Sequence, residues 1–141
     1  MKDYQLINPV ESEIRNDAGG SGHYGASRSK TVGEAIIRYK HHGTDYLCTL
    51  GQVVKAPCTG RILRHSYPYA DKSYDGVVIE GKRIMLKMFY FKPFEHMIGA
   101  DVLRGTPIGE AQDIGQRYNG VTPHIHIEIM QADPEIFMVE V

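Results

Sequence analysis

The sequence predicts a mainly β protein, built as a single small antiparallel β-sheet domain with long glycine-rich loops and at most one short helix. Its 141 residues suffice for one hydrophobic core but are too few for two. Its 15 glycines indicate many tight turns. From Gly51 onward, short runs of β-branched and aromatic residues are bounded by Gly, Pro or Asp, which is typical of a sheet protein.

The first thirty residues predict irregular structure. The segment NDAGGSGHYGASRSK, from Asn16 to Lys30, has four glycines and no hydrophobic period of 2 or 3.6. We therefore expect a surface loop system, which would form one wall of a binding groove. One short helix is predicted at Thr31–Tyr39, where TVGEAIIRY starts with a possible Thr cap, although Gly33 weakens it.

Strands are expected along the rest of the chain. They lie in GQVVKAP (51–57), TGRILRHS (59–66), YDGVVIEG (74–81), RIMLKMFYF (83–91), LRGTPIGEA (103–111) and HIHIEIM (124–130). Gly81-Lys82 suits a tight hairpin between the third and fourth of these. In the last, strict alternation predicts that Ile125, Ile127 and Ile129 enter the core.

Composition limits the partners and the compartment. With 16 basic and 17 acidic residues the net charge is −1, so we expect neither nucleic acid nor a membrane as a partner. Cys48 and Cys58 allow at most one disulfide, and two free buried thiols are expected. The segment MKDYQLINPVESEIR lacks the features of a signal peptide, which predicts synthesis in the cytoplasm; lysis and non-classical export are the expected routes to any action outside the cell.

Two clusters of metal-ligating residue types stand about eighty residues apart, HHGTD at residues 41–45 and HIH at residues 124–126. The glycine in the first lets histidine and aspartate face one point. Residues i and i+2 of a strand project from one face, so one histidine of the second cluster can bind a metal while the other acts as a general base. An isolated HxH pair is usually two exposed histidines, but the two clusters together predict a zinc site.

These segments resemble the lysostaphin or LytM-type zinc metallopeptidases, whose landmarks include HxGxD and HxHxE. HHGTD, GQVVKAPCTG, GTPIG and TPHIHIEI carry the resemblance, which covers about Gly22 to Met130. It implies a lysostaphin-like fold, with residues 22–135 as the zinc peptidase domain, 1–21 as an N-terminal extension and 136–141 as a C-terminal tail.

The resemblance also implies roles for individual residues. His41, Asp45 and His126 would be the zinc ligands, and His124 the catalytic histidine. Active members carry a second catalytic histidine at the end of the middle strand, where this sequence reads KMFYFK (87–92). Tyr90 is the expected substitute, as a hydrogen-bond donor to the oxyanion. The function implied is a zinc-dependent endopeptidase that cleaves peptide cross-links of bacterial peptidoglycan.

A second interpretation follows from the same departure. The segments YGASR, LKMFYFKP and ADPEIF resemble a chemotaxin-like branch of secreted animal proteins on this fold, which also lacks the middle-strand histidine. This resemblance implies a catalytically inactive zinc-binding module that recognises a protein or a cell-wall partner. The oligomeric state is left open.

Overall fold

The computed structural model describes residue 2 and residues 4–139. Within these residues the chain folds into short β-strands and three 3₁₀-helices, with no α-helix. The strands are β1 (Asn16–Asp17), β2 (Gly20–Ser21), β3 (Ser27–Val32), β4 (Ala35–Lys40), β5 (Thr44–Leu47), β6 (Val53–Lys55), β7 (Gly60–His65), β8 (Gly76–Gly81), β9 (Ile84–Phe89), β10 (Phe91–Pro93), β11 (Asp101–Val102), β12 (Pro107–Ala111) and β13 (His124–Ala132). The 3₁₀-helices are η1 (Glu95–Met97), η2 (Ile114–Gln116) and η3 (Pro134–Phe137). The predicted mainly β class is confirmed.

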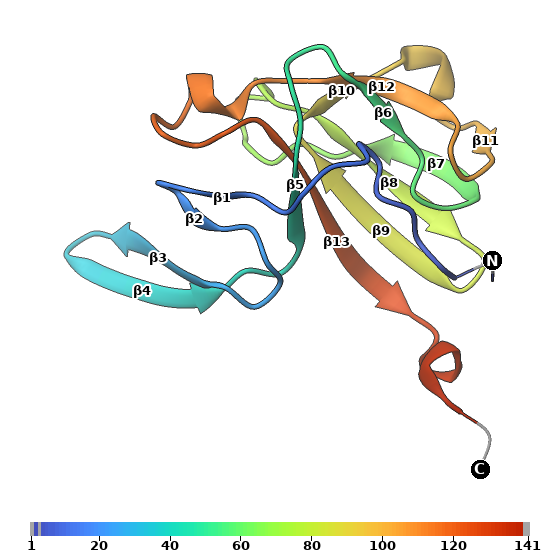
Figure 1. Ribbon diagram of the computed structural model, residues 1–141, viewed down its shortest axis with the longest axis horizontal. Coiled ribbons are helices and arrows are strands. Elements are labelled where there is room, and N and C mark those ends of the chain that lie inside the picture. The colour runs from blue at the N-terminus through green and yellow to red at the C-terminus, as the bar shows by residue number, and fades with distance from the viewer. Residues whose placement is uncertain (1, 3, 140–141) are drawn as a thin grey trace.

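A six-stranded antiparallel sheet, in the order β11-β7-β8-β9-β13-β5, forms the body of the molecule (Figure 1). Each of the six expected strand segments contains a strand, and β8 and β9 form the predicted hairpin. A second sheet, β10-β12-β6, shares the hydrophobic core with the first. Fully buried side chains of both sheets meet there, including Ile62, Leu86, Phe91 and Ile108. This apolar packing and the backbone pairing of residues 124–127 with β5 hold β13 in place beside β5.

The predicted helix at Thr31–Tyr39 is wrong. Residues 27–40 form the antiparallel hairpin β3–β4, which turns at Gly33 with a φ of 61° and pairs Val32 with Ala35. Every residue from Lys30 to Lys40 is exposed, so a helix here would have had no apolar face to bury. β-Branched residues on both sides of a glycine favour the hairpin instead. The expected irregular segment 16–30 likewise contains β1, β2 and β3.

The alternation predicted for the last strand holds only in part. Ile125 and Ile127 are buried, but Ile129 is 49% exposed. β5 pairs with β13 only from His124 to Ile127, so Ile129 lies beyond the part of the strand that has a neighbour on both sides. A register shift between β13 and β9 follows directly after Ile129.

The N-terminal segment packs on the same body. Val10 belongs to the hydrophobic core, and Leu47 on β5 donates a backbone hydrogen bond to Glu13. Residues 13–15 thus cover the outer edge of β5. At the other end Ile136 is buried within η3, while residues 140 and 141 of the expected tail lie outside the described residues. The division into an extension, a domain and a tail stays a prediction.

Cys48 and Cys58 are both free and buried, as predicted. No helix among the described residues has the length and apolarity needed to cross a membrane.

Candidate metal centre

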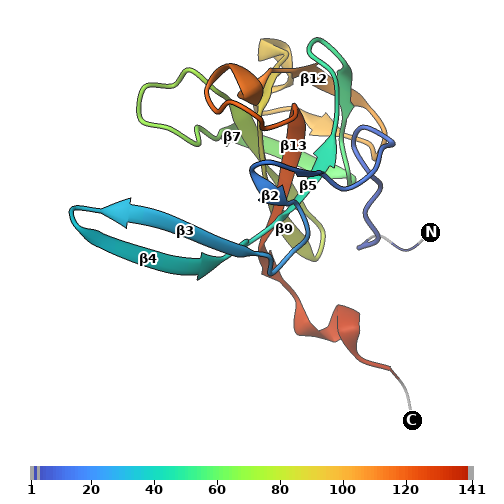
Figure 2. The same ribbon diagram turned by 60° about the vertical axis from the view of Figure 1, so that its left-hand side comes forward.

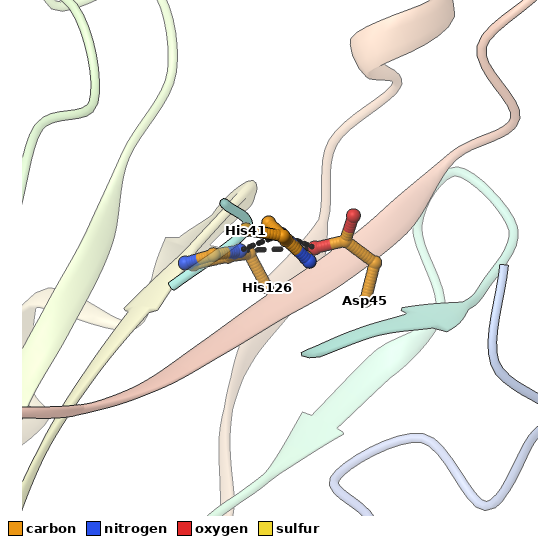
Figure 3. Close-up of side chains that lie close together, drawn as sticks. All are labelled: His41, Asp45 and His126. Atoms are coloured by element: carbon orange, nitrogen blue, oxygen red, sulfur yellow. Dashed lines mark hydrogen bonds and ion pairs between the residues drawn. The ribbon is translucent and has the colours of Figure 1, made fainter. Parts of the chain in front are cut away.

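Three buried side chains from two distant parts of the sequence meet at one point (Figure 3). Asp45 on β5 is the direct cross-strand partner of His126 on β13. His41 follows β4, and its ring reaches the same pair. The structure therefore brings together the three predicted zinc ligands within one group of facing ligand atoms.

Gly43 makes this convergence possible through close packing. A Cβ at residue 43 would lie 2.4 Å from the carbonyl oxygen of Ile127 and 2.6 Å from Cε1 of His126. The chain between His41 and Asp45 passes directly over the His126 ring, and any side chain at Gly43 would push the ring away. Glycine is needed here for close backbone approach rather than for a left-handed turn.

The spacing of the ligand atoms fits a small tetrahedral cation. Nε2 of His41, Nδ1 of His126 and Oδ1 of Asp45 are separated by 3.2 Å, 2.9 Å and 3.3 Å around the triangle. Zinc bound at its usual distances places neighbouring tetrahedral ligands about 3.3 Å apart. Three electron-rich atoms this close need a positive charge between them, which a shared proton or a metal ion can supply.

Hydrogen bonds on the far side of each ring fix which nitrogen faces the centre. Nδ1 of His41 donates to the carbonyl of His23 at 3.0 Å, since a carbonyl can only accept. Nε2 of His126 lies 3.2 Å from Oε1 of Glu128 and donates to it. The atoms that remain, Nε2 of His41 and Nδ1 of His126, face Asp45 and would present lone pairs to a metal ion once they lose any shared proton. This carboxylate–histidine arrangement is the one that proteins use to orient metal ligands.

Charge around the cluster is balanced by a buried arginine. Arg15 is 4% exposed and donates to Oδ2 of Asp45 from Nε at 3.3 Å and from Nη2 at 3.2 Å. Burial alone would raise the pKa of Asp45, but hydrogen bonds with His126 and His41 outweigh it and hold that pKa well below its ordinary value. Burial would lower the pKa of His126, yet Asp45 and Glu128 raise it. Asp45 is therefore ionised and ready to bind a cation.

His124 and Tyr90 lie beside the three ligand residues. Nδ1 of His124 donates to the carbonyl of Thr122 at 2.8 Å, which leaves Nε2 free at 3.6 Å from Oδ2 of Asp45. Burial lowers the pKa of His124, so its ring is neutral and can accept a proton. The Tyr90 ring meets the His124 ring edge-on, with centroids 5.0 Å apart. Both predicted catalytic residues thus face the centre.

The centre opens into a cavity of about 880 Å³. Its walls include the ligand residues, His124 and Tyr90, the tyrosines Tyr69 and Tyr118, and residues of the hairpin β3–β4. Part of the expected wall at residues 16–30 is present, since Gly19, Arg28, Ser29 and Lys30 line the cavity, although residues 27–30 are strand rather than loop.

Comparison with known proteins assigns the chain to a family. The model of Peptidase family M23 matches residues 39–137. The chain belongs to peptidase family M23. The match spans both histidine clusters of the centre, as the resemblance to lysostaphin predicted. The members of this family are metallopeptidases, and the ligand atoms of His41, Asp45 and His126 lie within 4.8 Å of one another, close enough to hold a metal ion.

Among relatives of this M23 protein, leukocyte cell-derived chemotaxin-2 of Bos taurus is 34% identical over 131 residues, which covers 90% of this chain and 80% of that protein. The Mus musculus form is 33% identical over 132 residues, with the same shares. Myeloid protein 1 of Gallus gallus is 31% identical over 127 residues, 86% of this chain and 36% of that protein. The predicted likeness to the chemotaxins is confirmed.

Solved structures show the same fold. The antimicrobial peptidase lysostaphin from Staphylococcus simulans matches with a TM-score of 0.56 and 21% identity, over 70% of this chain and 42% of that chain. Csd3 of Helicobacter pylori matches with a TM-score of 0.57 and 17% identity, over 98% of this chain and 34% of that chain. This chain therefore spans less than half the length of either structure.

Other histidines of the M23 chain stay out of the centre. His42 is exposed, as expected from the spacing of the motif, and it lines the cavity without joining the ligand cluster. His23 and His96 are exposed as well, and His65 pairs with Asp75 and Glu95. The contribution of Arg15 was not predicted from the residues, because a single arginine thirty positions before the aspartate carries no recognisable signal.

Proposed function

We propose that this M23 protein binds one zinc ion through His41, Asp45 and His126 and hydrolyses an extended peptide, with the peptide cross-links of bacterial peptidoglycan as the substrate class. The observation that carries the proposal is the convergence of three ligand atoms, each oriented from behind by its own hydrogen-bond partner, with a free side open to the cavity. Sites with three protein ligands and an open position are typical of catalytic zinc.

The chain supplies groups for the remaining steps. A bound zinc ion provides Lewis acidity, which polarises a carbonyl and acidifies water. Nε2 of His124 carries a lone pair beside the ligands and serves as the general base. Burial raises the pKa of Tyr90, so its phenol stays protonated and can donate a hydrogen bond to the developing oxyanion. The open cavity admits an extended chain.

The test measures cleavage and metal binding separately. Zinc-loaded protein is incubated with purified peptidoglycan and with pentaglycine, and released amines are counted. His124→Ala should abolish release while zinc content stays at one ion per chain. His96→Ala is the control, because it removes an exposed histidine that does not line the cavity. Equal amine release from wild type and His124→Ala would overturn the enzymatic proposal.

A second candidate is a non-catalytic zinc module that recognises a protein or cell-wall partner. Phe89 is the cross-strand partner of His126 on β9 and stacks on its ring at 5.5 Å, so an apolar ring lies where β9 ends, and Tyr90 follows it. The middle strand β9, residues 84–89, contains no histidine that could act at the centre. The chemotaxin relatives favour this candidate. Stoichiometric zinc with no amine release from any substrate would establish it in place of the peptidase.

A further inference from the structure

The hairpin β3–β4 is an arm that projects from the body of the molecule in both views (Figures 1 and 2). Its two strands pair only with each other among the described residues. Both outer edges therefore carry unpaired backbone donors and acceptors. A lone two-stranded hairpin is only marginally stable in water, and an open edge is a template for another extended chain.

The arm is strongly basic. Residues 27–40 contain Arg28, Lys30, Arg38 and Lys40 against the single acidic residue Glu34, a net charge of +3. Because the whole chain carries −1, the rest of the molecule carries −4. Positive charge is thus concentrated on one exposed element.

The pairing register separates two faces of the arm. Lys30 pairs with Ile37 and Arg28 with Tyr39, so these four side chains share one face. All four line the cavity of the metal centre. Arg38 and Lys40 belong to the opposite face and do not line it.

The two cations of the cavity face differ in their present contacts. Nη2 of Arg28 lies 3.8 Å from Oδ2 of Asp45 and donates to the carbonyl of Ser21 at 2.7 Å. Nζ of Lys30 lies 5.8 Å from the Tyr39 ring centroid and forms no ion pair with a described carboxylate. Lys30 is therefore the cation that an incoming anionic group would meet first.

We propose that the cavity face of the arm binds an acidic, extended peptide segment that continues into the metal centre. This inference rests on the proposed function of that centre as a peptide site. The peptide backbone pairs with an open edge of the arm, its carboxylates meet Lys30, and its apolar groups contact Ile37 and Tyr39. Charge complementarity selects this occupant, since a second copy of the arm, with its own net charge of +3, would be repelled. A flat anionic surface would meet the outer face with Arg38 and Lys40 before it met Lys30.

Fluorescence anisotropy with labelled peptides tests the proposal on the full chain in zinc-containing buffer. The probes are an eight-residue alternating Glu-Gly peptide and its Gln-Gly counterpart. The Glu-Gly peptide should bind roughly tenfold more tightly. Lys30→Glu should remove that preference. Arg38→Glu is the matched control, with the same charge change on the same strand pair but on the opposite face, and it should keep most of the preference at about 0.15 M salt, where exposed charges are screened within about 8 Å.

Three results would overturn the proposal: no preference for the acidic peptide, an equal loss in both variants, or a loss greater in Arg38→Glu. Dextran sulfate and vesicles containing phosphatidylserine serve as competing probes, and tighter binding of either with a dependence on Arg38 would assign the arm to a polyanion or a membrane instead.

The assay also separates the arm proposal from the proposed hydrolysis. Lys30-dependent binding without cleavage keeps the arm proposal and removes hydrolysis, whereas cleavage of both peptides at equal KM in wild type and Lys30→Glu removes the arm proposal alone.

Discussion

Oδ2 of Asp45 accepts hydrogen bonds from both Nε and Nη2 of Arg15, a residue thirty positions earlier in the chain. The two side chains are almost fully buried, with 3% and 5% of their surfaces exposed. The arginine occupies one carboxylate oxygen and leaves the other for the ligand cluster. A segment outside the M23 match thus sets the orientation of a central ligand.

Arg15→Met should destabilise the protein strongly. Removal of one partner from a buried ion pair leaves Asp45 and Asp17 without their shared cation, and such changes cost about 3–5 kcal/mol. Urea unfolding in the presence of a chelator measures the loss. Added zinc should recover part of it, because a divalent cation neutralises Asp45. Arg61→Met, which breaks an exposed pair with Asp101, is the control and should leave the midpoint unchanged. An equally small change in both variants would contradict the orienting role of Arg15.

Glu128 should tune the affinity for metal without binding it. Its hydrogen bond with His126 is the main cause that lowers the pKa of Glu128 to about 2, and Lys87 adds to the effect. Glu128→Ala removes the acceptor that orients the His126 ring, so zinc affinity should fall about 10- to 100-fold. Glu128→Gln keeps an oxygen acceptor and should lose less. Competition with a chromophoric chelator gives both values, and a complete loss of zinc in Glu128→Gln would identify Glu128 as a direct ligand.

His65 should make stability depend on pH. Burial alone would lower the pKa of His65, but Asp75 on Nδ1 and Glu95 on Nε2 outweigh it and raise that pKa above 6.5. A raised folded-state pKa gives stabilisation that is complete below about pH 6.5 and is lost as the pH rises through the folded value. The difference in unfolding free energy between about pH 6 and pH 8.5 should therefore shrink in His65→Gln. His96→Gln, at an exposed histidine, should keep the wild-type profile.

The two candidate clusters could be found in the sequence because their signal is local, and the resemblance to the zinc peptidases then singled out His41, Asp45 and His126 as the ligands. HxGxD and HxH each place their side chains by short-range geometry, but the cross-strand pairing of Asp45 with His126 depends on β5, a strand that was not predicted. Local patterns also predicted the six strand segments expected after Gly51, each of which contains a strand. In β9 the alternating residues match the more buried and less buried faces of the sheet, whereas β13 is buried on both faces from His124 to Ile127.

The hairpin β3–β4 and the pairing of Arg15 with Asp45 could not be predicted from local sequence patterns. TVGEAIIRY carries a possible helix cap and helix formers. It folds as a hairpin because these residues are all exposed, so a helix here would have no surface to pack against. The pairing of Arg15 with Asp45 arises from the chain returning along the edge of β5, which no local pattern records. The run Phe89-Tyr90-Phe91 was expected as one continuous strand, yet it breaks at Tyr90.

The break between β9 and β10 positions the Tyr90 side chain for a catalytic role. Its φ of 79° is unusual for a residue other than glycine. Two backbone hydrogen bonds hold this conformation: Tyr90 N donates to Asp75 O at 2.8 Å, and Gln112 N donates to Tyr90 O at 2.9 Å.

Tyr90→Phe keeps this backbone and the edge contact with His124, and removes only the phenol oxygen. If hydrolysis uses that oxygen to stabilise the oxyanion, kcat on a cleaved peptide should fall about 100-fold or more with little change in KM. Zinc affinity should be unchanged. Tyr69→Phe removes the phenol that lies 3.4 Å from Tyr90 Oη and should leave kcat within a few-fold of wild type. Full activity in Tyr90→Phe would mean that Tyr90, which follows β9, has only a structural role, and that His124 acts without a partner from this part of the chain.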